Sequence, residues 1–128
     1  MTSESAVTGA AQADGHDPPV DLDWLNECMD NDAEAIKTIV DLYVTRTDGQ
    51  ILELETAMSA NAAADVKRIA HSCVGSSGTC GMERMASLFK SLEKLGAARN
   101  LMGGPAVVNE VRQEFERVKQ FLSSKGMR

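Results

Sequence analysis

His71 is the residue of this chain best suited to do chemistry, and it lies in the stretch AHSCVGSSGTCGM, residues 70–82. A neutral imidazole is a good nucleophile near neutral pH and is also a common metal ligand. Two cysteines and three glycines share the stretch with it. Three roles therefore have to be weighed: nucleophile, metal ligand and buried structural histidine.

The spacing of the stretch disfavours a metal site and a hydrolase triad. His71 and Cys73 are two residues apart, so on a helix their side chains diverge by about 200°, and no second His or Cys pair has tetrahedral spacing. Ser76 and Ser77 lie in no nucleophile elbow. We expect no metal ligand in this chain, and its odd number of cysteines implies no disulfide framework.

A helical wheel separates an inner from an outer face. Apolar or small residues gather within about a quarter of the circumference: Val66, Ile69, Ala70, Cys73, Ser77 and Cys80. His71 lies about 150° from their centre and is predicted to face solvent. The same outer face carries Lys67, Arg68, Gly75 and Gly78.

Two glycines on the histidine's own face need a reason, because each costs a helix about 1 kcal/mol relative to alanine. We interpret Gly75 and Gly78 as clearance that lets another protein approach the imidazole. Residues 75–78 also fit the end of a helix followed by a polar loop, in which case His71 would be an ordinary surface histidine.

The elements that must position His71 are helices. Residues 21–29 predict a short helix, and a long one follows, capped by Asn31 or Asp32 and bent at Gly49. Asn61 is the expected cap of the helix that carries His71, residues 82–98 form the next, and the last follows the Gly-Gly-Pro of residues 103–105. The sequence therefore predicts an all-α fold, an antiparallel four-helix bundle with a short additional N-terminal helix. We expect a flexible N-terminal tail over residues 1–19, the bundle domain over 20–124 and a C-terminal tail over 125–128.

Charge and hydropathy limit the partners. The net charge is -6, yet residues 61–100 hold six basic and three acidic side chains, which favours an acidic or phosphorylated partner near His71. An acidic chain without a dense basic cluster is a poor nucleic-acid binder. No apolar run is long enough to cross a bilayer and no secretory signal opens the chain, so we expect a cytoplasmic protein without membrane contact. We also expect it to be a monomer.

The stretch IAHSCVGSSGTCGMERMASLFKSLE, residues 69–93, resembles the histidine phosphotransfer (HPt) domains of multistep two-component phosphorelays. The matching features are Ala-His, Gly-Ser-Ser, a later Gly and the final Leu and Leu-Glu, and the opening DLDWL of residues 21–25 fits as well. The resemblance covers about residues 20–122. It implies that His71 is the phosphoacceptor and that the partners are response-regulator receiver domains, together with a hybrid histidine kinase.

One position departs from the family. Where the family commonly has a lysine three residues after the histidine, this chain has Val74, so a basic group for the phosphoryl must come from elsewhere. Lys67 and Arg68 are candidates on the same helix. Arg84 and Lys90 on the following helix are others.

The chain lacks a Walker loop and a kinase-type glycine loop, so we expect a phosphocarrier without kinase activity or a cofactor of its own, and Mg²⁺ belongs to the receiver. Two alternatives stay open. One is an adaptor that docks on receiver or kinase domains without carrying phosphate. The other is an unrelated helical interaction domain, since any bundle shows amphipathic stripes.

Overall fold

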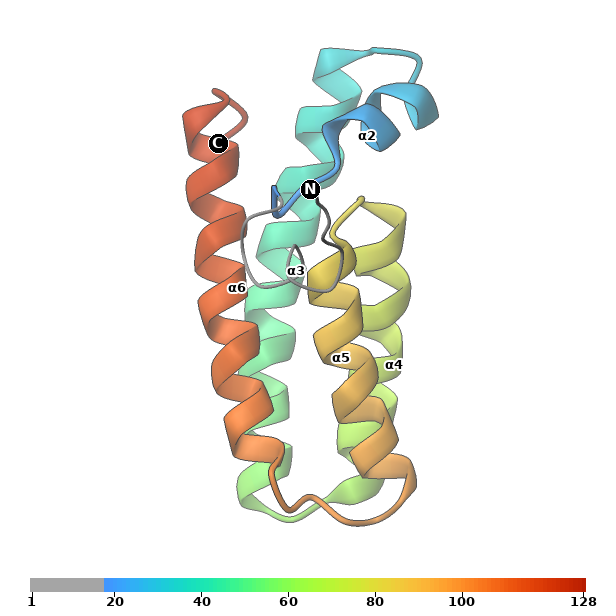
Figure 1. Ribbon diagram of the computed structural model, residues 1–128, viewed down its shortest axis with the longest axis vertical. Coiled ribbons are helices and arrows are strands. Elements are labelled where there is room, and N and C mark those ends of the chain that lie inside the picture. The colour runs from blue at the N-terminus through green and yellow to red at the C-terminus, as the bar shows by residue number, and fades with distance from the viewer. Residues whose placement is uncertain (1–17) are drawn as a thin grey trace, which may run out of the picture.

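The computed structural model describes residues 18–128, which form five helices and no strand (Figure 1). These helices are α2 (Leu22–Cys28), α3 (Ala33–Ser59), α4 (Ala63–Thr79), α5 (Glu83–Ala97) and α6 (Gly104–Ser124). The predicted all-α class is confirmed. Residues 1–17 of the predicted tail lie outside the described part, so that prediction stands untested.

The four long helices form an antiparallel bundle in which α3, α4, α5 and α6 pack as a closed ring of neighbours (Figure 1). The short helix α2 lies at the end of the bundle where α4 turns into α5. The backbone N–H of Asp21 donates to the Gly81 carbonyl at 2.8 Å, and Trp24 Nε1 donates to the Thr79 carbonyl at 3.2 Å. These two bonds fasten α2 to the α4–α5 turn. None of the helices in residues 18–128 is long and apolar enough to cross a membrane.

The hydrophobic core is built from apolar residues on one face of each long helix. Buried apolar residues come from all four long helices: Ile36, Val40, Tyr43, Val44, Ile51, Leu54, Val66, Ile69, Ala70, Cys73, Met85, Leu88, Phe89, Leu92, Val108, Val111, Phe115, Val118 and Leu122. Helix α2 buries only Leu25; Leu22 and Met29 are half-buried and Cys28 is exposed.

The predicted N-cap residue is correct for α3 and wrong for α4. Asp32 caps α3, and its Oδ1 accepts the N–H of Ala35 at 3.1 Å. Asn61 does not cap α4: the N-cap is Ala62, without a side-chain bond, and Asn61 has φ 54°. The tight α3–α4 connection needs a left-handed residue at that point, a conformation that asparagine tolerates better than most residues. Helix α3 is continuous through Gly49, the position of the predicted bend.

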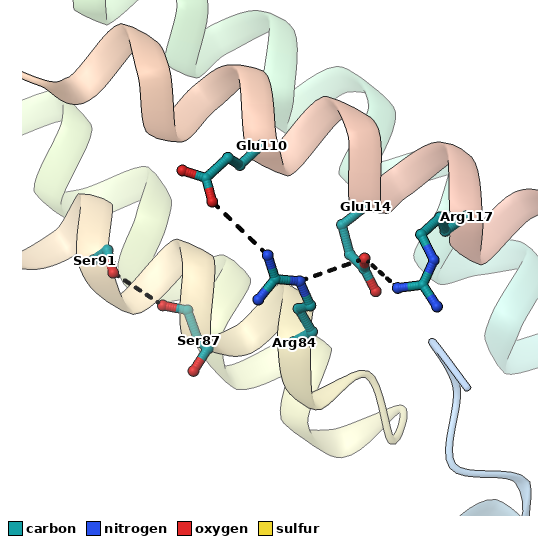
Figure 2. Close-up of polar contacts among 6 residues, drawn as sticks. All are labelled: Arg84, Ser87, Ser91, Glu110, Glu114 and Arg117. Carbon is teal, nitrogen blue, oxygen red and sulfur yellow. Dashed lines mark hydrogen bonds and ion pairs between the residues drawn. The ribbon is translucent and has the colours of Figure 1, made fainter. Parts of the chain in front are cut away.

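An ion-pair cluster joins α5 to α6 (Figure 2). Glu114 on α6 is buried, and its Oε1 lies 2.7 Å from Arg117 Nη1 and 3.7 Å from Arg84 Nε on α5. Arg84 Nη2 also lies 3.8 Å from Glu110 Oε1. The guanidinium of Arg84 therefore forms ion pairs with two carboxylates of α6.

Candidate functional site

His71 lies in the middle of α4 on the outer side of the bundle. Its side chain is 75% exposed, whereas Cys73 and Cys80 on the same helix are 0% and 4% exposed. The predicted orientation of His71 is thus confirmed. Helix α4 continues to Thr79, so residues 75–78 are helical and their alternative interpretation as a polar loop is wrong.

Glu93 on α5 holds the imidazole from the neighbouring helix. Its Oε2 lies 2.7 Å from His71 Nδ1, and its side chain is 15% exposed. The hydrogen bond from His71 lowers the pKa of Glu93, the charge of Lys90 adds to this, and burial acts in the opposite direction. An ionised carboxylate only accepts hydrogen bonds, so Nδ1 carries the proton and the lone pair of the neutral ring is on Nε2. Nε2 is therefore the ring nitrogen with a lone pair available for nucleophilic attack.

Lys90 approaches the second oxygen of the same carboxylate. Its Nζ lies 3.6 Å from Glu93 Oε1, and its side chain is 55% exposed. One carboxylate group therefore lies between the imidazole of His71 and the ammonium of Lys90. The contact between Glu93 and His71 was not predicted from the sequence, where Glu93 was noted only as part of the Leu-Glu pattern.

The two glycines after His71 face open space. A Cβ atom added at Gly75 or at Gly78 would have no neighbouring atom within 4 Å. Packing within this chain consequently gives no reason for glycine at either position, although each weakens the helix by about 1 kcal/mol. This supports the interpretation that the space serves an approaching molecule.

A groove of about 240 Å³ opens between α3 and α4, next to Gly75. Residues of both helices line it: Ile39, Leu42, Tyr43, Arg46, Thr47, Gln50, Ser72, Gly75, Ser76, Thr79 and Cys80. Leu42 is 55% exposed at its edge. A larger hollow of about 610 Å³ lies near Arg84, Glu114 and Arg117, but His71 does not line it. The surface beside His71 thus combines open glycines with a partly apolar groove.

The other predicted phosphoryl-binding residues have different surroundings. Lys67 is exposed one turn before His71. Arg68 Nη2 lies 3.5 Å from Asp65 Oδ1 on its own helix. Val74 is half-buried and packs against the core. Of the two candidates on α5, Lys90 lies next to the Glu93 carboxylate that binds His71, whereas Arg84 forms ion pairs with α6 (Figure 2).

Comparison with protein families gives a match to the Hpt domain over residues 38–121, well over half of the chain. This chain belongs to the Hpt domain family. Its structure is similar to the crystal structure of histidine-containing phosphotransfer protein B (HptB) from Pseudomonas aeruginosa PAO1, with a TM-score of 0.78 at 22% identity. The similarity covers 87% of this chain and 97% of HptB, and it shows the shared fold. Comparison with curated proteins gives no match.

Membership of the Hpt family gives the chain a histidine phosphotransfer role in phosphorelays. Hpt domains are phosphocarriers rather than kinases, and they interact with receiver and kinase proteins. The matched segment begins inside α3 and ends inside α6, so it includes both His71 and Glu93.

Proposed function

We propose that His71 accepts a phosphoryl group from a phospho-aspartate on one receiver domain and passes it to an aspartate on another. The observation that carries the proposal is the 2.7 Å contact between His71 Nδ1 and Glu93 Oε2 on a ring that is three-quarters exposed. This contact leaves the lone pair on Nε2. The open positions at Gly75 and Gly78 give a receiver room to bring its phosphoryl group to that atom.

The transfer step follows from this geometry. The Nε2 lone pair attacks the phosphorus, the bond from phosphorus to the aspartate oxygen breaks, and the aspartate leaves as a carboxylate. The ring keeps its Nδ1 proton and gains a positive charge, which the ionised Glu93 offsets at hydrogen-bond distance. Donation to the second receiver is the reverse of this step, with that receiver's aspartate as the nucleophile.

The division of labour gives this chain the nucleophile and a docking surface. We propose no cofactor of its own. The receiver supplies Mg²⁺ and the groups that stabilise charge on the transferring phosphoryl. We further place the exchange in the cytoplasm, between a monomer of this chain and its receivers.

The test is transfer of labelled phosphate from receiver domains encoded in the same genome. We expect label on the wild-type chain and none on His71→Gln, while His16→Gln, at the only other histidine, behaves as wild type. Label that persists on His71→Gln would refute the assignment of His71.

An adaptor that binds receivers without carrying phosphate is the second candidate, and Val74 is the observation that favours it. A half-buried aliphatic side chain beside His71 offers neither charge nor a hydrogen bond to a phosphoryl group. Binding of receivers by the wild-type chain without any transfer of label would establish this alternative.

A further inference from the structure

Phosphorylation of His71 would create a local excess of negative charge. A phosphoryl group carries about two negative charges near neutral pH. Glu93, already ionised and 2.7 Å from the other nitrogen of the ring, offsets the positive charge that the ring gains, so this pair leaves the phosphoryl charge itself uncompensated. A cation within reach of the phosphoryl group would stabilise the phosphorylated state, and Val74 cannot supply one.

Lys90 differs from the other basic residues near His71 by its contact with the carboxylate that binds the imidazole, whereas Lys67, exposed one turn before His71 on α4, forms no ion pair with Glu93 in the described structure. Arg68 Nη2 lies 3.5 Å from Asp65 on its own helix, and the guanidinium of Arg84 lies 3.7 Å from Glu114 and 3.8 Å from Glu110 of α6 (Figure 2). Lys90 Nζ, in contrast, lies 3.6 Å from the very carboxylate that orients His71.

The contact between Lys90 and Glu93 is an ion pair without a hydrogen bond. At 3.6 Å it is longer than a hydrogen bond, and Glu93 Oε1 is a buried atom without a hydrogen-bond partner. An ammonium group has three N–H donors on a flexible stem, so it can approach Oε1 and a second acceptor together. In the unphosphorylated site, the Lys90 ammonium therefore has N–H donors that are not hydrogen-bonded to Glu93.

We propose that Lys90 stabilises the phosphohistidine, and that its ammonium bridges Glu93 Oε1 and a phosphoryl oxygen on His71 Nε2. The inference rests on the proposed function of His71. Lys90 would act from α5, across the helix interface, and would stabilise the phosphorylated state without taking part in bond making or breaking. Its removal should change how much phosphate the chain holds at equilibrium more than it changes receiver binding.

The experiment measures the equilibrium constant for phosphoryl transfer from a phosphorylated receiver to each of four forms of the chain. These are wild type, Lys90→Met, Lys90→Arg and Lys94→Ala, a matched control because Lys94 is an exposed lysine one turn further along α5. We expect Lys90→Met to lower the equilibrium constant for phosphorylation of the chain by the receiver roughly two- to fivefold, the effect of losing an exposed ion pair. Lys90→Arg and Lys94→Ala should stay near wild type, and the Lys90→Met deficit should shrink in high salt.

The outcomes separate this inference from the function on which it rests. A wild-type chain that takes no label would refute the proposed function itself. Label on wild-type His71 with an unchanged constant for Lys90→Met would overturn only the role of Lys90. An equal loss in Lys94→Ala would overturn it as well, because general basic charge on α5 would then explain the effect.

Discussion

The close approach of α4 and α5 at Gly96 makes a strong prediction about stability. An added Cβ would lie 2.6 Å from the backbone N of Lys67, 2.8 Å from the carbonyl oxygen of Ala63 and 2.9 Å from the Lys67 Cα. Ordinary non-bonded contacts are about 3.5–4.0 Å, so the helices would have to separate by about 1 Å. Overpacking of this kind costs about 1–3 kcal/mol, and better helix propensity returns at most about 1 kcal/mol. Since all three atoms are backbone, we expect Gly96→Ala to lose about 2 kcal/mol of unfolding free energy.

Urea denaturation measures this loss, and Gly49→Ala is the matched control. With an m-value of about 2 kcal/mol/M, the midpoint of Gly96→Ala should fall by about 1 M. At Gly49 an added Cβ has no neighbour within 4 Å, so the same substitution in α3 should stabilise by about 0.5–1 kcal/mol. The reasoning would be refuted if Gly96→Ala were as stable as wild type or moved in the same direction as Gly49→Ala.

Three further predictions concern the site surface, the buried core and pH. Gly75→Gln should slow phosphotransfer about tenfold or more by blocking a receiver, while urea midpoints stay equal or rise; unchanged transfer would show that the open space has no role in docking. Tyr43→Phe breaks the buried 2.7 Å bond to Ser77 and should cost about 1–2 kcal/mol, and the added change Ser77→Ala should recover part of it, which a double-mutant cycle in urea measures. The paired hydrogen bond from Arg112 lowers the pKa of Glu55, so its stabilisation is present above about pH 4.3 and is lost as pH falls through the lowered pKa. Urea titrations between pH 5 and 3 should therefore show a smaller loss of stability in Glu55→Gln than in wild type, by less than about 1 kcal/mol because the pair is partly exposed; equal losses would show that the pair contributes nothing.

The bundle could be predicted because its periodicity is a local property of the sequence. Apolar residues at helical spacing fix which face of each helix is buried, and the wheel of α4 places His71 opposite to Cys73 for the same reason. Asp32 is predictable as a cap because its own side chain makes the capping bond. Asn61 was misplaced because a left-handed turn residue and an N-cap favour the same amino acid.

The partners of His71 could not be predicted because they depend on how two helices pack. Glu93 is 22 residues away from His71, and only the rotation and register of α5 against α4 bring the two side chains together. Which of the two basic residues of α5 lies near His71 depends on packing as well. The position of α6 places Glu114 next to Arg84, whereas Lys90 lies next to Glu93. The burial of Glu114 likewise follows from its neighbours rather than from its type.

The most direct test of the account is to locate the phosphoryl group by NMR. The chain, labelled with nitrogen-15 and phosphorylated by a phosphorylated receiver, gives long-range correlations that distinguish the two ring nitrogens of His71. We predict the phosphoryl group on Nε2 and a proton on Nδ1, held by Glu93 at the 2.7 Å contact. A phosphoryl group on Nδ1, or on a residue other than His71, would contradict the account.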